Sequence, residues 1–405
     1  MTFARAMLVV FLPFACGYFF SYLFRTINAV VAPHLRADIG LGAAELGFLT
    51  SAYFLTFAAA QIPLGMLLDR FGPRRVQAVL YSVAALGAVL FALGDSAATL
   101  TLGRALIGAG VSGGLMAALK AIVLWFPRKR IALVNGWYLA SGGLGAIGST
   151  VPVEFLLGIV DWRTLFLGLG VCTFAMACLI FVAVPEKPGT ASGGTFRVQM
   201  RALGAIYRDR YFWRIVPLMF TCSSSNMAVQ GLWAGPWLAD VSGYDSAGVA
   251  RHLLLMAMAL TVGMASSGAV AGLMQRLGLS LSGTIGLGAA LFVLSQVAIV
   301  LEITDKTYLL WCAYGFLSTL TSLVFAALAQ HFPETHIGRA NTAANVMVFS
   351  AAFSYQAGLG AIIDLWPSDA DGAYPAAAYA AAFWTTITTQ SLALAWYLSP
   401  WSKRK

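Results

Sequence analysis

The sequence has little charge for its length. Asp, Glu, Lys and Arg make up 10% of the 405 residues, 60% are hydrophobic, and the mean hydropathy is +0.80. Soluble globular domains carry about 25% charged residues. A chain this long with so few charges cannot cover a water-exposed surface with polar side chains. A soluble fold is therefore excluded, and an integral membrane protein is expected.

Several kinds of site chemistry are also missing from the sequence. The five cysteines form no CxxC pair and all fall within apolar stretches, which favours packing over disulfides or a zinc site. No GxxxxGK[ST] loop, nucleophile elbow or metalloprotease motif occurs. The sequence therefore predicts that the chain is neither an enzyme nor an ATP-driven pump, and that it uses no cofactor and no metal.

The charges that are present stand in short clusters between apolar stretches. That arrangement is typical of membrane loops, so the net charge of +9 does not indicate a nucleic-acid partner. Apolar stretches of about 20 residues are long enough to cross a bilayer as helices. Twelve spans of an all-α membrane protein are predicted, at 6–31, 45–67, 76–94, 98–125, 131–158, 164–184, 214–236, 248–271, 280–301, 307–330, 340–363 and 376–398.

One long connection divides these spans into six and six. It predicts a cytoplasmic linker over 186–213, first glycine-rich and flexible, then basic and amphipathic, between six-helix bundles at 1–185 and 214–405. With both termini in the cytoplasm, 18 of the 25 Lys and Arg residues face inside, which the positive-inside rule favours. We therefore expect a multi-pass monomer in the lipid bilayer of a bacterial inner (plasma) membrane.

A short motif follows the second predicted span. The stretch GMLLDRFGPRR, 65–75, resembles the signature G-x-x-x-D-R-x-G-x-R-R of the major facilitator superfamily. The residues in register are Gly65, Asp69, Arg70, Gly72 and Arg75. The resemblance implies two pseudo-symmetric six-helix bundles around a central site, with this loop acting as a conformational latch on the cytoplasmic side.

Two further stretches support the resemblance. AGLMQRLG, 271–278, is a degenerate copy of 65–72 after span eight, with Gln275 in place of the signature aspartate, as expected of two parallel halves. RALIGAG, 104–110, resembles the family's span-four arginine motif and assigns Arg104 a conformational role. Span five lacks the G-P-x-x-G-G motif of the family's drug–proton antiporters, which disfavours drug efflux.

Three charged side chains fall at similar depths within the predicted spans. Arg25 and Arg104 lie about six residues, and Glu154 about four residues, from the predicted outer ends of spans one, four and five. A charge inside the bilayer costs at least about 2.5–3.5 kcal/mol, so it usually faces a cavity or a partner. Arg25 is therefore a candidate anion anchor and Glu154 a candidate proton site. The alternatives are a structural ion pair and snorkelling toward headgroups, and snorkelling is the expectation for Lys120.

The neighbours of Arg25 favour a cavity. Tyr18, Tyr22 and Arg25 have the spacing i, i+4, i+7 and share one helix face, which Asn28 continues at i+10. This polar stripe on an apolar helix predicts contact with water or substrate. A buried hydrogen-bonded seam between helices is the alternative interpretation.

Span seven, the pseudo-equivalent of span one, is polar but uncharged. Asn226 and Gln230 share a face there, and Trp233 lies one turn further along. These three residues are candidates for hydrogen bonding to substrate and for shaping the site. Tyr138 in span five is a further candidate, with interhelical hydrogen bonding as its alternative role.

The expected function is secondary active transport by alternating access. The favoured substrate is a small organic anion or zwitterion, coupled to protons, with import favoured over export. Proton-driven efflux of hydrophobic compounds is one alternative, and a non-transporting sensor is another. Copper or other soft-metal uptake is a third, because His252 and Met256 have H-x-x-x-M spacing on one helix face.

Overall fold

The computed structural model describes residues 2–186, 203–369 and 372–399, without the side chains of 132, 334 and 335. Every regular element within these ranges is helical, and none of them is a strand, so the predicted all-α class is confirmed. The chain forms two compact units, Met1–Leu41 with Phe48–Gly193, and Gly42–Gly47 with Gly194–Lys405. Residues 187–202 of the predicted linker at 186–213 lie outside the described residues, and a long helix already begins at Arg210. The amphipathic helix and the proposed domain bounds stay predictions.

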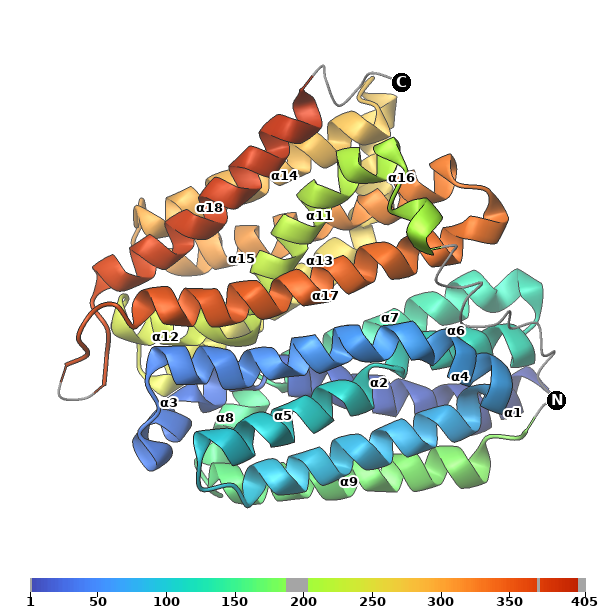
Figure 1. The fold of residues 1–405 in the computed structure, drawn as a ribbon, viewed down its shortest axis with the longest axis horizontal. Coiled ribbons are helices and arrows are strands. Elements are labelled where there is room, and N and C mark those ends of the chain that lie inside the picture. The colour runs from blue at the N-terminus through green and yellow to red at the C-terminus, as the bar shows by residue number, and fades with distance from the viewer. Residues whose placement is uncertain (1, 187–202, 370–371, 400–405) are drawn as a thin grey trace. The chain divides into compact units, whose positions relative to one another are not determined.

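The described part of the first unit holds nine α-helices, with the first turn of α4 grouped with the second unit (Figure 1). They are α1 (Phe3–Ala6), α2 (Leu12–Thr26), α3 (Asn28–Ile39), α4 (Ala43–Ala92), α5 (Ala97–Val111), α6 (Gly114–Trp125), α7 (Ile131–Gly148), α8 (Val151–Leu157) and α9 (Trp162–Ala183). A π-helical turn, Met7–Phe11, joins α1 to α2, and a 3-10 turn, Arg128–Arg130, precedes α7.

The second unit follows the same pattern of long helices with short breaks. Its α-helices are α11 (Arg210–Ala228), α12 (Ala234–Asp240), α13 (Ser246–Arg276), α14 (Leu281–Val300), α15 (Thr307–Ser318), α16 (Val324–His331), α17 (Glu334–Ile363) and α18 (Ala376–Leu398). A π-helical turn, Val229–Trp233, joins α11 to α12, and a 3-10 turn, Thr319–Leu323, joins α15 to α16. Helix α13 packs on α15, and α11 packs on α17.

Polar residues set where several helices begin. Ser96, Asp161, Asp209, Asp245 and Ser280 each accept a hydrogen bond from a backbone N–H three residues later. Such N-caps satisfy donors that have no partner within the helix. The cap at Asp161 also lowers the pKa of its carboxyl, because the backbone N–H of residue 164 hydrogen bonds to the charged form.

Among the described residues, eight helices are long and apolar enough to cross a membrane, or nine if the bent pair 133–148 and 151–157 forms one span. One of them, α4, contains 50 residues and covers two predicted spans, 45–67 and 76–94. It is interrupted at Gly72, whose φ of 76° lies in the left-handed region that favours glycine. The total of twelve spans therefore stays a prediction.

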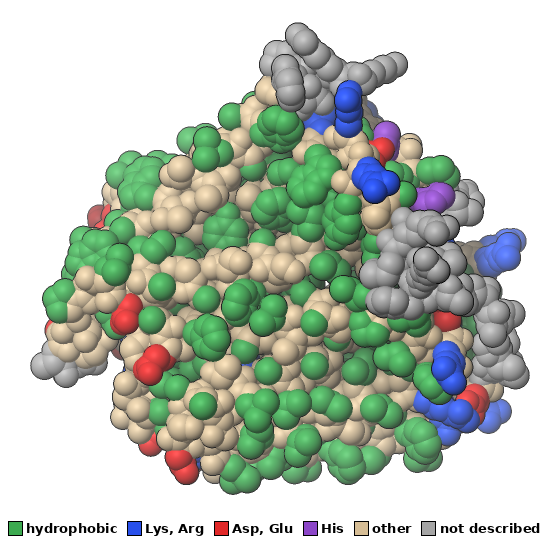
Figure 2. Space-filling view, in the orientation of Figure 1, with side chains coloured by type: hydrophobic (Ala, Val, Ile, Leu, Met, Phe, Trp, Pro, Cys, Tyr) green, Lys and Arg blue, Asp and Glu red, His purple; other side chains and the backbone are tan. Residues whose placement is uncertain are grey.

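Apolar side chains cover the sides of the helices (Figure 2). Val182, Val171 and Phe155 are 79%, 69% and 68% exposed, and many other large hydrophobic side chains are exposed as well. In the first unit, Asp and Glu side chains gather near α3, and Lys and Arg gather at the opposite end near α1. A surface with apolar sides and charged ends is suited to a lipid bilayer.

Two buried glutamines join α14 to α18. Gln296 Nε2 donates to Gln390 Oε1 at 2.8 Å, and Gln390 Nε2 donates back at 3.1 Å. The Thr386 hydroxyl donates to the same Gln296 oxygen at 3.0 Å. Gln296 is 2% exposed and Gln390 is 0% exposed, so neither amide can exchange its partner for solvent water.

Replacing Gln390 by leucine is expected to lower the free energy of unfolding by about 1–3 kcal/mol, because the buried Gln296 amide loses both of its hydrogen bonds to Gln390. Thermal unfolding of the purified protein would measure this change. The double variant Gln296→Leu/Gln390→Leu should recover part of the loss, since it leaves neither amide unpaired. If the loss of free energy of unfolding in the double variant equals the sum of the losses in the two single variants, the two glutamines are not a coupled pair.

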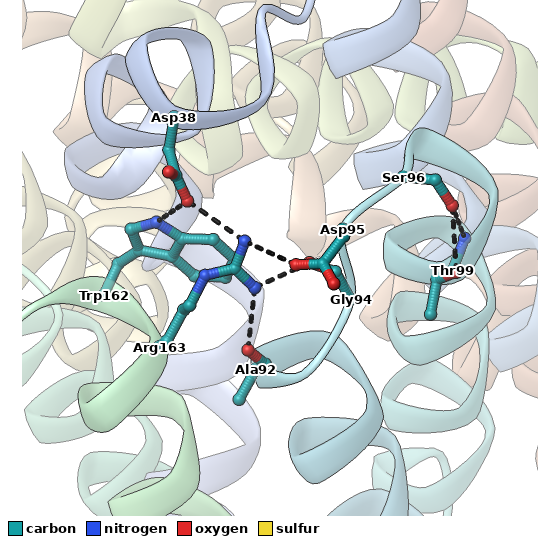
Figure 3. A network of polar contacts seen from close by, with 8 residues as sticks. All are labelled: Asp38, Ala92, Gly94, Asp95, Ser96, Thr99, Trp162 and Arg163. Atoms are coloured by element: carbon teal, nitrogen blue, oxygen red, sulfur yellow. Dashed lines mark hydrogen bonds and ion pairs between the residues drawn. The ribbon is translucent and has the colours of Figure 1, made fainter.

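Arg163, near the start of α9, ties together three segments of the first unit (Figure 3). Its Nη1 donates to the carbonyl oxygens of Ala92 at 3.0 Å and Gly94 at 2.6 Å. Its Nη2 lies 3.1 Å from a carboxylate oxygen of Asp38 on α3 and 3.1 Å from one of Asp95. The guanidinium therefore connects α3, the end of α4 and α9.

Replacing Arg163 by leucine should lower the free energy of unfolding by about 1–3 kcal/mol, mainly through the lost carbonyl and Asp38 contacts. Asp95 is 89% exposed, so its ion pair adds little. Arg251→Leu is the matched control, because Arg251 is exposed and its Nε donates within its own helix. Equal thermal stability of the two variants would contradict this role for Arg163.

Candidate functional site

The first predicted span is broken beside Arg25. Helix α2 ends at Thr26 and α3 begins at Asn28. The Thr26 hydroxyl donates to the carbonyl of Tyr22 at 3.0 Å, and Arg104 Nη1 donates to the carbonyl of Phe24 at 2.9 Å. Side-chain groups thus donate hydrogen bonds to backbone carbonyl oxygens in the last turn of α2. Ile27, between the two helices, keeps right-handed helical dihedral angles (φ −59°, ψ −29°), so Arg25 lies in the last turn of α2, next to a one-residue interruption.

Aromatic side chains surround the Arg25 guanidinium. Its Cζ atom lies 4.3 Å from the ring centroid of Tyr22 and 5.7 Å from that of Phe57. Tyr53 forms a side-chain hydrogen bond with it. Cation–π contacts of this kind stabilise a partly desolvated cation. Arg25 is half-buried, so it is held within the first unit while part of its surface stays accessible.

The predicted face that joins Tyr18, Tyr22 and Arg25 is present in the structure. The Tyr18 and Tyr22 rings meet edge to face at 5.1 Å, and Tyr18 stacks on Tyr138 of α7 at 4.6 Å. The Tyr138 hydroxyl donates to the Gly114 carbonyl at 2.6 Å, and its side chain is fully buried. The structure therefore brings all four predicted residues together, with Tyr138 acting as the interhelical contact.

Asn28 continues the stripe into the interior. It is fully buried, and its Nδ2 donates to the Thr50 hydroxyl of α4 at 2.9 Å. Its Oδ1 is also buried and has no hydrogen-bond partner among the described residues. Asn28 thus connects the start of α3 to α4.

Arg104 lies deeper than Arg25. It is fully buried on α5, and its guanidinium lies 5.3 Å from the Tyr53 ring centroid. Both arginines therefore contact the same tyrosine. Tyr53 was not among the sequence candidates. Unlike Tyr18 and Tyr22, it has no charged residue within two turns on its own helix, so helical spacing did not single it out.

Glu154 belongs to the short helix α8. The pair α7 and α8 is bent by 40°, and Glu154 is half-buried in the first turn after the bend. At the bend, the Ser149 hydroxyl lies 2.7 Å from the Thr26 hydroxyl, at the end of α2. The segment that leads to Glu154 is therefore held against the turn that carries Arg25.

In the second unit, the three candidate residues of span seven differ in burial. Asn226 on α11 and Gln230 in the following π-helical turn are half-buried. Trp233 is 1% exposed, and its Nε1 donates to the carbonyl of Gln356 on α17 at 3.2 Å. The π-helical turn changes the 3.6-residue spacing on which the predicted common face relied.

Asp69 of the signature loop has a specific partner. Lys120 Nζ on α6 lies 2.5 Å from Asp69 Oδ1 and donates to the Leu68 carbonyl at 2.8 Å. Lys120 therefore binds a carboxylate and a backbone carbonyl within the first unit. The sequence analysis expected it to extend toward the lipid headgroups. This contact joins the loop to the fourth predicted span.

The remaining signature residues lie near the surface. Arg75 pairs with Glu186 at 2.8 Å, and Arg70 is exposed with its Cζ 5.1 Å from the Phe71 ring centroid. Gly72 supplies the positive φ of the turn. A Cβ atom at Gly65 would meet nothing within 4 Å, so close packing does not explain that glycine.

His252 is engaged by oxygen atoms on both ring nitrogens. Nδ1 lies 2.8 Å from the Gly248 carbonyl, and Nε2 lies 3.0 Å from the Thr307 hydroxyl. Met256 is buried one turn further along α13. Within the described residues, no group of three or more His, Cys, Asp or Glu side chains could hold a metal ion. The H-x-x-x-M spacing is explained by packing and hydrogen bonding.

A family model for the Major Facilitator Superfamily matches residues 14–355. The chain belongs to the Major Facilitator Superfamily. The family resemblance predicted from the loop at 65–75 is thereby confirmed over most of the chain. As a member of this transporter family with several membrane-spanning helices, the chain is a multi-pass membrane protein and not an enzyme.

Curated relatives of the chain are transporters of the same superfamily. A probable sulfoacetate transporter of Cupriavidus necator is 24% identical over 364 residues, covering 84% of this chain and 84% of that protein. A hexuronate transporter of Escherichia coli is 23% identical over 370 residues, covering 86% of this chain and 85% of that protein.

Solved structures share the fold. A bacterial homolog of the human lysosomal transporter Spinster matches with a TM-score of 0.78 and 16% identity, over 98% of this chain and 97% of that one. A D-xylose–proton symporter matches with a TM-score of 0.75 and 16% identity, over 99% of each chain. The similarity places the chain in the superfamily fold over its full length.

Proposed function

We propose that this superfamily member moves a small organic anion or zwitterion across a bacterial inner membrane by alternating access, coupled to protons. The observation that carries the proposal is the position of Arg25. Its guanidinium lies in the last turn of α2, within an apolar predicted span, and is surrounded by tyrosines. A permanent cation costs free energy within a bilayer and is retained there chiefly for function.

Arg25 is the residue that would hold the negative group of the substrate. Guanidinium forms charge-assisted, two-pronged hydrogen bonds with carboxylate and sulfonate groups. Tyr18 and Tyr22 would line the same face as Arg25. The tyrosine rings would then contact the part of the substrate next to its negative group.

The relatives support an anionic substrate. The names of the relatives above specify sulfoacetate and hexuronate, and both of these carry a negative group. A nitrate/nitrite transporter of Picosynechococcus is 26% identical over 46% of this chain. An anionic substrate needs a cationic group to bind it, and Arg25 is the residue we propose for this role.

Glu154 is the proposed proton carrier. It is half-buried on α8, and the bend before it is hydrogen bonded to the residue that follows Arg25. A carboxyl group near a cation can change its protonation when the surroundings of either group change. We also propose that both termini of the chain lie in the cytoplasm.

Transport by the purified protein in proteoliposomes tests this function. Sulfoacetate, glucuronate, galactonate and nitrate would be supplied outside at acidic pH, with an alkaline interior. We expect at least one anion to accumulate and a protonophore to abolish its accumulation. Transport of lipophilic cations or copper alone, with none of the anions, would contradict the proposal.

A further inference from the structure

Tyr53 lies between the two arginines of the first unit. Its side chain is fully buried on α4, its hydroxyl hydrogen bonds with Arg25, and its ring lies 5.3 Å below the Arg104 guanidinium. The same hydroxyl is 3.5 Å from the Ser21 carbonyl, one turn before Arg25 on α2. A phenol can accept one hydrogen bond and donate another. Tyr53 can therefore accept from Arg25 while its proton points to α2.

The position of the Tyr53 ring is fixed by its neighbours. It stacks on Phe57 at 6.1 Å and meets Phe54 edge to face at 5.3 Å. Gly108 of α5 lies so close that a Cβ atom there would overlap the Tyr53 carbonyl oxygen. Because α4 and α5 are in direct backbone contact at this point, the ring cannot shift without moving a helix.

Arg104 contacts the backbone of the same turn of α2. Its Nη1 donates to the carbonyl of Phe24, the residue before Arg25, and its guanidinium rests on the Tyr53 ring. Tyr53 thus contacts the side chain of Arg25, and Arg104 contacts the backbone of the same turn. We call these two residues the Arg25 frame.

We propose that Tyr53 is a positioning residue that fixes the direction of the Arg25 guanidinium before the anion binds. This inference rests on the proposed function, since it concerns the same anion site. A guanidinium is planar and carries its five N–H donors in a fixed fork, so a bond to Tyr53 at one donor sets the direction of the whole group. A side chain that is already ordered loses less conformational entropy on binding.

Tyr53→Phe tests the inference, because it keeps the ring that supports Arg104 and Phe57 but removes the hydroxyl. The KM for sulfoacetate or glucuronate should rise about tenfold while the maximal rate stays within about twofold. Tyr308→Phe, on an exposed residue of α15, is the matched control. An unchanged KM, or a lower maximal rate at unchanged KM, would overturn the inference.

A second measurement needs no substrate. Phenylglyoxal modifies arginine, and mass spectrometry would give the rate at Arg25 and, as an internal reference, at Arg163. Tyr53→Phe should speed modification of Arg25 several-fold and leave Arg163 unchanged. Equal rates at Arg25 in wild type and variant would overturn the inference. If no anion is transported, the proposed function fails, and the labelling rates still decide whether the frame exists.

Discussion

Replacing Arg25 by lysine is expected to lower kcat/KM for the transported anion about 100-fold. Lysine keeps the charge but lacks the planar fork of donors that binds two anion oxygens at once. It also removes the cation–π geometry with Tyr22 and the hydrogen bond with Tyr53. A hydrogen bond to a charged group contributes about 1.5–3 kcal/mol, and every 1.4 kcal/mol is a factor of ten.

Initial uptake rates over a range of anion concentrations would measure this effect, with thermal unfolding to show that the variant is folded. Arg25→Ala should abolish uptake, because no cation remains for the anion. Arg251→Lys is the control, since Arg251 is exposed on α13. An Arg25→Lys protein that transports the anion as well as wild type would show that Arg25 is structural.

Replacing Glu154 by glutamine is expected to abolish accumulation driven by a pH gradient. Glutamine retains the size and hydrogen-bonding groups of the side chain, but it cannot bind and release a proton. Exchange of labelled for unlabelled anion across the membrane should continue within about threefold, because it requires no net proton movement. Parallel assays of gradient-driven uptake and of exchange would separate the two processes.

Glu302→Gln provides the control for this experiment, because Glu302 is exposed just after α14. If Glu154→Gln still accumulates the anion against its gradient, the coupling proton binds elsewhere. If both accumulation and exchange disappear in a folded protein, Glu154 serves the transport cycle itself rather than coupling.

Much of the helix arrangement could be predicted from the sequence. The predicted spans 280–301 and 376–398 correspond to α14 (Leu281–Val300) and α18 (Ala376–Leu398). The agreement has a physical cause, because the bilayer fixes the length of an apolar helix and capping residues fix its start. The face shared by Tyr18, Tyr22 and Arg25 was also predictable, since it depends only on helical spacing.

The breaks within spans could not be predicted from local patterns. The span 6–31 reads as one helix, but it ends at Thr26, where Arg104 donates to the Phe24 carbonyl from 80 residues away. The same reason applies to Tyr53 and to the pair Lys120–Asp69, whose partners come from other helices. Trp233 ends the π-helical turn Val229–Trp233, and its buried side chain donates to the Gln356 carbonyl of α17. Each of these features depends on tertiary contacts that spacing along the chain does not encode.

The central claim is that Arg25 anchors an anionic substrate. Ligand-dependent thermal stabilisation of the purified protein, measured side by side for wild type and Arg25→Lys, tests it most directly. The ligands would be carboxylates, sulfonates, nitrate, amino acids, sugars, lipophilic cations and Cu(I). We predict that one class of anion raises the unfolding temperature of wild type and not of Arg25→Lys. Equal stabilisation of both proteins, or stabilisation by lipophilic cations or Cu(I) alone, would contradict the account.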